Sequence, residues 1–355
     1  MAFFSVNKVA IRGISGCVPK EVEENSSLPF YAPGEAEQVI EAIGIERRHV
    51  APPDITASDL CAKAAQTLLD QLGWEKDSVD LLAFCTQMSD YLYHPNSFIV
   101  HDSLGLPEST VCLDYFHGCP GWVTSLSSVA AMVQSGQIKR ALLLDGDTAC
   151  RNFSINDRES RPLFGDAGIA TALEYDEKAA PMYFHIGSLS KDGRAIANCN
   201  PLGGQRMPFT PQTLQQLLDF RAGKIPFEEY AAKMDSMDVF AFALTKVPKA
   251  LKKLCAHFGI ETDSADHLML HQANKLIVEH IAKRMRIPME RVPLSLRNYG
   301  NTTSASIPMT LVSECADALA SGKQRLLLCG FGTGLAYAAA YLETDHILCP
   351  PIDEL

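Results

Sequence analysis

The sequence predicts an α/β fold of two similar halves, layered as α/β/α/β/α. The first observation behind this prediction is an internal repeat, because residues 73–82 and 259–268 are identical at six of ten positions. The register continues without a gap to Gly136 and Gly322, which are also 186 residues apart. The second observation is that helix-like stretches alternate with short runs that are apolar throughout. Such runs are typical of strands buried on both faces of a sheet.

The repeat divides the chain of 355 residues into halves at about 1–170 and 171–355. In the first half a helix is predicted over 57–72, ending at Gly73, because glycine commonly follows a helix C-terminus. A strand at 79–85, a helix at 122–134 and a strand at 140–144 follow. The second half repeats this order with a helix at 239–258, a strand at 267–270, a helix at 307–320 and a strand at 325–329. The stretch 201–237, with a Gly-Gly pair and a glutamine-rich helical segment, is interpreted as an insertion.

Composition limits the classes of function. The 31 Lys and Arg against 42 Asp and Glu give a net charge of −11, which disfavours nucleic acid and anionic membranes as partners. The first thirty residues contain no apolar run long enough for a signal peptide or a membrane span, which predicts a cytoplasmic protein. The eleven cysteines include no Cys-x-x-Cys pair, which argues against a disulfide framework and a zinc ribbon.

Cys119 is the first candidate for catalysis. It follows a strand-like run, and Pro120 suits the first position of the helix that begins there. The unpaired amides and the dipole of a helix N-terminus favour thiolate over thiol. Gly118 and Gly121 allow a substrate or another backbone segment to approach closely. A buried structural cysteine is the alternative, and we adopt that interpretation for the other ten.

Two further candidates lie in the second half. His271 directly follows the predicted strand 267–270, at a strand end where catalytic groups gather in such sheets. His267 and His271 also suggest a metal site, but no carboxylate third ligand lies nearby. Asn301 lies in Asn-Tyr-Gly-Asn-Thr-Thr-Ser, for which a turn and a helix cap is the simpler interpretation. The repeat makes this loop the counterpart of the Cys119 loop, so a pseudo-twofold axis would bring the two together.

A glycine-rich turn, Gly-Phe-Gly-Thr-Gly, follows the predicted strand 325–329. Its spacing differs from the G-x-G-x-x-G of dinucleotide-binding proteins, and only 21 residues follow Gly334, too few for such a binding unit. We interpret it as a tight turn that brings backbone amides beside a reacting carbonyl group.

These four motifs, in this order, resemble the thiolase superfamily, and within it the β-ketoacyl-acyl-carrier-protein synthase III branch. The likeness covers nearly the whole chain, including Ile-Arg-Gly-Ile-Ser-Gly-Cys-Val-Pro at 11–19 and Leu-Phe-Gly-Asp at 163–166. Simple thiolases have a second catalytic cysteine where this chain has the glycine-rich turn. Longer-chain condensing enzymes have histidine at the position of Asn301.

The resemblance implies a duplicated fold, usually a homodimer, and decarboxylative Claisen condensation of an acyl thioester with a malonyl group on a carrier protein. It implies that Cys119 carries the acyl group, and that His271 and Asn301 stabilise the enolate left when CO₂ departs. The amides of Cys119, Gly332 and Thr333 would hold the acyl oxyanion. The implied scheme uses no metal and no redox cofactor.

The positions for the acyl donor, a thioester of coenzyme A or of a carrier protein, depart from the family pattern. A Trp and an Arg that grip the coenzyme A adenine are Gln38 and Ala42 here, whereas Arg158 matches the later nucleotide-contacting Arg. The carrier-docking Arg is replaced by Leu276, with Lys275 beside it. Substrate contacts are therefore predicted at Arg158, Tyr93, Asn274 and Lys275.

Three alternatives remain open. The order Cys, His, Asn also occurs in papain-like proteases, although these are secreted, disulfide-bearing chains without the duplication. An enzyme of the same fold could pass the acyl group to a hydroxyl or an amine, but such relatives typically replace the residue at Asn301. A non-catalytic partner subunit would generally lack Cys119 or His271, and both are present.

Overall fold

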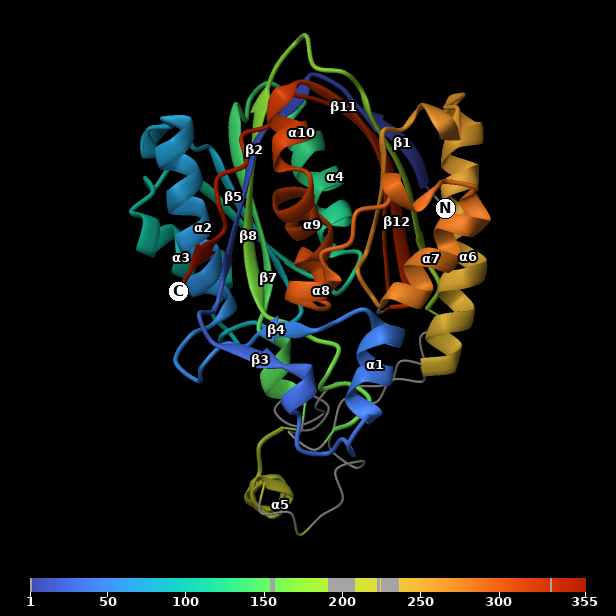
Figure 1. Cartoon of the computed structure of the whole chain (residues 1–355). Helices are drawn as coiled ribbons and strands as arrows, with labels where there is room; N and C mark the ends of the chain where they lie inside the picture. Colours follow the sequence, from blue (N-terminus) through green and yellow to red (C-terminus); the bar gives the residue numbers. More distant parts are fainter. Residues whose placement is uncertain (1, 154–156, 191–207, 222–223, 225–235, 333) are drawn as a thin grey trace.

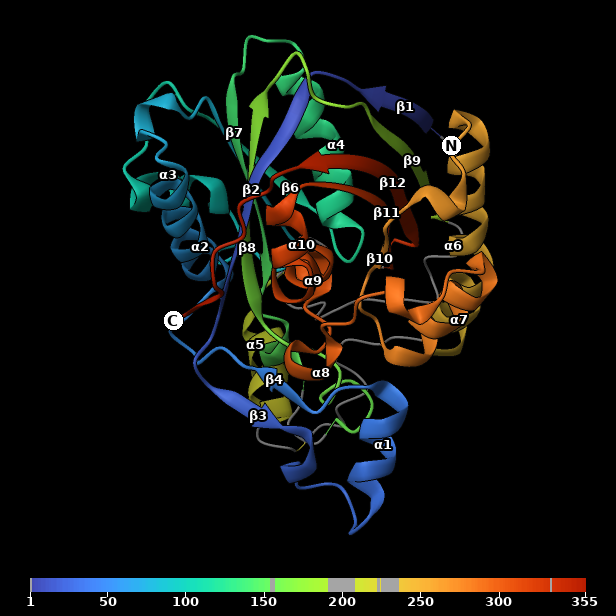
Figure 2. The ribbon, with the colours of Figure 1, turned by 45° about the horizontal axis from the view of Figure 1, so that its top comes forward.

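The computed structural model describes residues 2–153, 157–190, 208–221, 224, 236–332 and 334–355. In this part of the chain two β-sheets alternate with three layers of helices (Figures 1 and 2). The outer layers are α2 (Ala57–Leu72) with α3 (Asn96–Leu104), and α6 (Ser236–Phe258) with α7 (Lys275–Met285). The middle layer contains α4 (Gly121–Val133), α9 (Ser306–Glu314) and α10 (Ala316–Ser321). The predicted α/β/α/β/α layering is confirmed.

The first sheet has six strands in the order β13-β2-β8-β7-β5-β6. They are β2 (Val9–Val18), β5 (Leu81–Thr86), β6 (Val111–Phe116), β7 (Arg140–Asp147), β8 (Ala167–Tyr175) and β13 (Asp353–Glu354). Strand β7 is parallel to β5 and antiparallel to β8, and β8 is antiparallel to β2. Nearly every residue of β5 and β7 is buried, because helices cover both faces of the sheet.

The second sheet has five strands in the order β1-β9-β12-β11-β10. They are β1 (Ala2–Val6), β9 (Met182–Ser188), β10 (His267–Leu270), β11 (Lys323–Gly332) and β12 (Ala336–Asp345). The series β9-β12-β11-β10 repeats β2-β8-β7-β5 with the same directions of pairing. The short 3-10 helices Lys76–Ser78 and Thr262–Ser264 keep the spacing of 186 residues. The internal repeat is therefore a repeat of topology.

The two ends of the chain each join the opposite half. Strand β1 pairs with β9 in the second sheet, and β13 pairs with β2 in the first. The sequence pattern did not indicate that either terminal strand pairs with the opposite half. The predicted boundary between residues 170 and 171 falls inside β8, so the first sheet extends to Tyr175.

Most predicted elements form where the sequence placed them, and the main difference concerns the predicted helix 307–320. Helices α2 and α6 end at Leu72 and Phe258, and the glycines that follow adopt positive φ. The predicted helix 307–320 is divided into α9 and α10, because Cys315 (φ −123°, ψ 5°) leaves the helical conformation. Within the predicted insertion, α5 (Pro211–Arg221) is the glutamine-rich helix, and most of the remainder lies outside the described residues.

Helix α4 is anchored in the middle layer by Trp122. The indole is 1% exposed, and its Nε1 donates to Thr171 Oγ1 of β8 at 3.1 Å. Burial of such a side chain stabilises the fold by roughly 2–3 kcal/mol. The start of α4 is thus fixed against the first sheet, which matters because Cys119 lies two residues before it.

A small cap lies at the lower end of the layers in Figure 1. It contains β3 (Val22–Glu24), β4 (Arg47–His49) and α1 (Glu35–Ile43).

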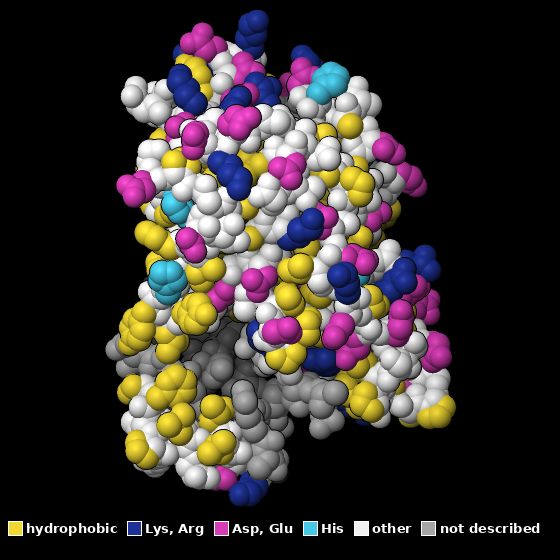
Figure 3. Space-filling model, turned by 90° about the vertical axis from the view of Figure 1, so that its left-hand side faces the viewer, with side chains coloured by type: hydrophobic (Ala, Val, Ile, Leu, Met, Phe, Trp, Pro, Cys, Tyr) yellow, Lys and Arg dark blue, Asp and Glu magenta, His cyan; other side chains and the backbone are white. Residues whose placement is uncertain are grey.

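Apolar side chains also gather in the lower left part of the face shown in Figure 3. We call the exposed apolar residues on and around β6 the β6 apolar surface: Tyr91, Leu92, Tyr93, Phe98, Val111 and Phe116. Among the described residues, no helix combines the length and apolar character that crossing a membrane requires.

Candidate active site

Cys119 lies in the loop between β6 and α4 and is partly buried. Pro120 precedes α4 as its capping residue, whereas the sequence placed it at the first helical position. The loop turns tightly, since the Gly121 N–H donates to the Gly118 carbonyl at 2.6 Å. Unpaired amides at the start of a helix favour thiolate over thiol at such a position. The setting predicted for a reactive cysteine is therefore present.

Two glycines of β11 lie against the Cys119 loop. A Cβ atom at Gly332 would lie 2.8 Å from Cys119 Sγ, and a Cβ atom at Gly330 would lie 2.8 Å from Pro120 Cα. No side chain fits at these distances, so glycine lets the backbone approach the thiol. The end of β11 is thus beside the sulfur, where the predicted oxyanion site would be. Thr333, the other predicted donor, lies outside the described residues.

His271 follows β10, and its side chain is buried. Its Nδ1 lies 2.7 Å from Ser306 Oγ. The Ser306 hydroxyl also accepts the backbone N–H of Gln272 at 3.4 Å, so its own proton is available for His271 Nδ1. A neutral ring with this partner carries its proton on Nε2. The Phe331 ring packs edge-on against the imidazole, with ring centroids 5.3 Å apart.

Burial lowers the pKa of His271 to about 3, although a hydrogen bond with the Thr303 backbone acts in the opposite direction. The unfolded chain binds a proton here near pH 6.5, but the folded chain resists protonation until about pH 3. We therefore expect His271 to lower the free energy of unfolding as the pH falls from 6.5, by at most about 1.4 kcal/mol per pH unit. Denaturant titrations of the native protein and of His271→Gln at pH 7 and pH 5 measure this effect. An identical pH dependence in the two proteins would contradict it.

The side-chain amide of Asn301 is buried and has one defined orientation. Its Oδ1 accepts the backbone N–H of Thr303 at 2.9 Å. A backbone N–H can only donate, so the oxygen must face Thr303 and Nδ2 must point away as a donor. The Asn301 backbone also pairs with Leu163 O at 2.8 Å and Gly165 N at 3.1 Å. The loop is thereby joined to the first half of the chain.

The structure brings the three predicted catalytic residues to one junction between the halves. The Asn301 loop meets the first turn of α4, because a Cβ atom at Gly121 would lie 3.0 Å from Ser304 Cβ. Strand β11 carries both the ring that packs on His271 and the glycine that faces Cys119. Cys119, His271 and the Asn301 loop therefore lie at one junction, which is the candidate active site.

Arg158, a predicted substrate-binding residue, lies at the cap. It forms an ion pair with Glu35 at the start of α1, and its guanidinium lies 6.0 Å and 5.9 Å from the ring centres of Phe30 and Tyr31. Both charged side chains are exposed enough that the pair contributes at most about 1 kcal/mol. A substrate contact by Arg158 stays a prediction.

The other predicted substrate-binding residues have structural partners of their own. Asn274 Oδ1 accepts the Ile277 N–H at 2.9 Å and so caps α7. The stem of Lys275 packs on α1, since a Cβ atom at Gly44 would lie 2.7 Å from Lys275 Cβ. Tyr93 is 84% exposed and belongs to the β6 apolar surface. Substrate contacts by these residues stay predictions.

Sequence reasoning missed three residues that hold the site together. Ser306 binds His271, Thr303 binds Asn301, and Asp147 binds Thr303. The signal for Asp147 was an acidic residue at the end of an otherwise apolar strand, because such residues are seldom fully buried without partners. Ser306 and Thr303 carried no comparable signal, since hydroxyl residues commonly cap turns.

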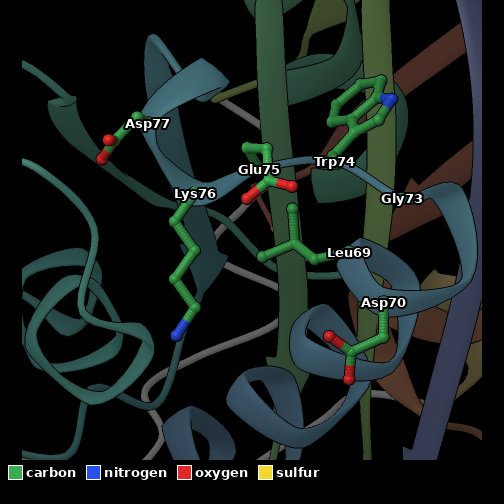
Figure 4. A pocket seen from close by; sticks show the side chains of 7 residues that line it. All are labelled: Leu69, Asp70, Gly73, Trp74, Glu75, Lys76 and Asp77. Atoms are coloured by element: carbon green, nitrogen blue, oxygen red, sulfur yellow. The ribbon is translucent and has the colours of Figure 1, made fainter.

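A surface pocket at the C-terminal end of α2 contains none of the predicted site residues (Figure 4). It is lined by Leu69, Asp70, Gly73, Trp74, Glu75, Lys76 and Asp77. Within the described ranges, no group of three His, Cys, Asp or Glu side chains is arranged to hold a metal ion.

The duplicated layers place the chain in the thiolase superfamily, and comparison with known proteins narrows the class. Residues 113–190 match the family described as 3-oxoacyl-[acyl-carrier-protein (ACP)] synthase III, and residues 255–344 match its C-terminal part. A β-ketoacyl-[acyl-carrier-protein] synthase III of Synechococcus elongatus is 32% identical over 341 residues, covering 96% of this chain and 98% of the relative. The crystal structure of a 3-oxoacyl-(acyl-carrier protein) synthase from Burkholderia xenovorans LB400 gives a TM-score of 0.90 at 34% identity, covering 100% of this chain and 99% of that chain.

The chain belongs to the β-ketoacyl-[acyl-carrier-protein] synthase III family. It is a condensing enzyme of the transferase class, and the decarboxylative condensation of fatty-acid type synthesis expected from the sequence is confirmed. This membership excludes the papain-like alternative.

Proposed function

We propose that Cys119 carries an acyl group and transfers it to the carbon of a malonyl thioester as CO₂ leaves, which makes the chain an acyltransferase by its chemistry. The fixed amide of Asn301 is the observation that supports this proposal most directly. Its Nδ2 and the Nε2–H of neutral His271 are two uncharged donors at the junction that also contains the thiol. Such donors stabilise a developing enolate oxygen in a dry site.

In the first half-reaction the Cys119 thiolate attacks the carbonyl carbon of an acyl thioester. A carbon–sulfur bond to Cys119 forms, the bond to the donor sulfur breaks, and the donor leaves as a thiol with the proton that Cys119 lost. We assign the oxyanion to the backbone amides of Cys119, Gly332 and Thr333. The close approach of Gly332 to Sγ supports this assignment.

In the second half-reaction a malonyl thioester places its carbonyl oxygen on Asn301 and His271. The carboxylate leaves as CO₂, the electron pair becomes the enolate, and the enolate carbon attacks the acyl-Cys119 carbonyl. A carbon–carbon bond forms, the bond to Sγ breaks, and Cys119 returns to the thiolate. No proton enters or leaves in this sequence, so a His271 that stays neutral suits the role of hydrogen-bond donor.

Turnover of a radiolabelled malonyl thioester with and without an acyl primer tests the proposed function. We expect release of CO₂ and a β-ketoacyl product that depends on the primer. Transfer of the acyl group from Cys119 to an alcohol or amine without CO₂ release would overturn the proposal in favour of an enzyme of the same fold that acylates hydroxyl or amino groups. The identity of the primer follows from the same assay with a series of acyl chains.

We propose that the enzyme accepts its acyl group from a carrier-protein thioester at least as readily as from a coenzyme A thioester. Gln38 and Ala42 lie exposed on α1 and supply no stacking ring, and Arg158 is engaged with Glu35. We therefore expect kcat/KM for the same acyl group to differ by less than about tenfold between the two donors, or to favour the carrier. Glu35→Gln, which frees Arg158, should raise kcat/KM for the coenzyme A donor alone. A strong coenzyme A preference in the native enzyme would contradict this expectation.

We propose that an acidic carrier protein docks on the exposed face of α7. Lys283, Arg284 and Arg286 are exposed near its end, and Leu276 is exposed near its start. Helix α7 begins soon after His271, so this face is continuous with the site. The positive charges attract an acidic partner, and the exposed apolar residue gives the bound partner a surface on which to pack.

We propose a homodimer that forms through β6. Strand β6 is the edge strand of the first sheet, and its apolar residues Val111 and Phe116 are exposed. An unpaired edge with exposed apolar side chains favours pairing with a second copy of the chain. Sedimentation of the whole protein distinguishes the dimer from a monomer. The cytoplasmic location expected from the sequence stays a prediction.

A further inference from the structure

Asp147 is a buried carboxylate that joins the two halves beside the candidate active site. It lies at the end of β7 and is 0% exposed. Its Oδ1 accepts Thr86 Oγ1 at 2.6 Å and the Gln87 backbone N–H at 3.1 Å, both from the end of β5 in the first half. Its Oδ2 accepts Ser304 Oγ at 3.1 Å and the Thr303 hydroxyl, both from the second half.

The bond to Thr303 connects Asp147 to one of the proposed enolate donors, Asn301. Thr303 adopts φ 54°, a conformation that L-residues with branched side chains rarely hold without support. Its N–H orients the amide of Asn301. The position of this backbone unit therefore sets the direction of the amide, and Asp147 is the group that holds the unit.

Asp145 shows that burial alone does not produce this arrangement. It lies two residues earlier on β7, is also 0% exposed, and has the Cys85 thiol and Ser304 hydroxyl beside it. Neither of its oxygens forms a hydrogen bond of normal geometry within the described part of the chain. Burial raises the pKa of both carboxyl groups, and at Asp147 hydrogen bonds from Thr303, Thr86, Gln87 and Ser304 act in the opposite direction. The structure thus contains a matched internal control.

We propose that Asp147 is a positioning residue for decarboxylation, holding Thr303 so that the Asn301 amide points at the malonyl thioester oxygen. This inference rests on the proposed function of Asn301 and His271. Asp147 touches neither substrate nor reacting atoms, and it acts through the Thr303 hydroxyl. Displacement of a catalytic group by about 1 Å is enough to lower a rate by about 10²-fold, because orientation contributes much of the barrier reduction.

Thr303→Val and Thr303→Ser test the connection with little change of volume. Valine keeps the branched shape but removes the hydroxyl, whereas serine keeps the hydroxyl. We expect Thr303→Val to lower the rate of CO₂ release about 10- to 100-fold and to change single-turnover acylation of Cys119 by less than about threefold. Thr303→Ser should restore most of the rate. Equal loss in both variants would overturn the proposal.

Asp147→Ala and Asp145→Ala remove the same atoms from two equally buried sites. We expect Asp147→Ala to reproduce the selective loss of CO₂ release and Asp145→Ala to stay within about threefold of the native rate. In the double variant Asp147→Ala/Thr303→Val the losses should not multiply, because both changes break one connection. If Asp147→Ala fails to fold, the Thr303 pair still decides the question.

The outcomes separate this inference from the proposed function. If the native enzyme releases no CO₂ from malonyl thioesters, the proposed function fails. If the native enzyme releases CO₂ and the Thr303→Val and Asp147→Ala variants do so at the native rate, only the positioning role fails. Losses that multiply, or a parallel fall of acylation and CO₂ release, would show that Asp147 stabilises the fold without directing the amide.

Discussion

Asn301→Ala should still form acyl-Cys119 and yet release CO₂ about 10²–10³-fold more slowly than the native enzyme. The reason is that Asn301 Nδ2 points away from Thr303 as a donor, because its Oδ1 is already occupied at 2.9 Å. Loss of a donor aimed at a developing oxyanion in a dry site costs roughly 3–4 kcal/mol. The acyl-enzyme oxyanion is assigned to other donors around Gly332, so the first half-reaction should be spared. Single-turnover acylation and malonyl-dependent CO₂ release are measured on the same preparation.

Asn298→Ala is the matched control for this change. Asn298 lies three residues earlier, and its Oδ1 accepts Arg47 Nε at 3.1 Å on the exposed side of the segment. We expect both half-reactions of this variant to remain at the native level. If Asn301→Ala slows acylation and CO₂ release by the same factor, Asn301 holds the loop and does not bind the substrate.

Cys119→Ala should abolish acyl-enzyme formation and lower condensation by at least about 10³-fold, because the proposed reaction carries the acyl group on the Cys119 thiol. The same variant should still release CO₂ from a malonyl thioester, since Asn301 and His271 are untouched. The two variants should therefore lose opposite half-reactions, since Cys119→Ala loses acylation and Asn301→Ala loses CO₂ release. Mass spectrometry after incubation with an acyl thioester should place the added mass on the peptide that contains Cys119.

The selectivity of labelling follows from the surroundings of the other thiols. Burial raises the pKa of all nine other described cysteines, to about 12 for Cys17, Cys315 and Cys349, and these groups stay protonated at neutral pH. Cys112→Ala, in the strand β6 that precedes the Cys119 loop, should leave activity unchanged. Labelling of another cysteine in a Cys119→Ala protein that remains fully active would refute the assignment. We also expect His117→Ala to be far milder than His271→Ala.

Local patterns were enough to predict most of the fold and to select three candidate catalytic residues that the structure places at one junction. Helix α2 was predicted to the residue, because apolar periodicity and a terminal glycine both act within a few turns. Cys119, His271 and Asn301 were selected because each follows a strand or lies in a turn with an unusual concentration of polar and small residues. These signals depend on neighbours in the sequence.

Contacts between distant segments could not be predicted in this way. Asp147 and Thr303 form a hydrogen bond between the two halves. The residues around each of them in the sequence do not indicate that the other is its partner. The pairing of β1 and β13 with the opposite half was not predicted for the same reason. A strand of two to five residues is too short for its periodicity to indicate a partner strand. The division into α9 and α10 at Cys315 was missed because the apolar pattern continues through it.

The exchanged terminal strands also set the order in which this chain can fold during synthesis. Ala2 pairs with Ile186, so the first strand has no partner until half of the chain has left the ribosome. Asp353 pairs with Cys17, so the first sheet keeps an open edge at β2 until residues 353 and 354 are made. Closing such long loops is entropically costly and slows folding. Until then, a chaperone or a second nascent chain can reach the unpaired edge of β2.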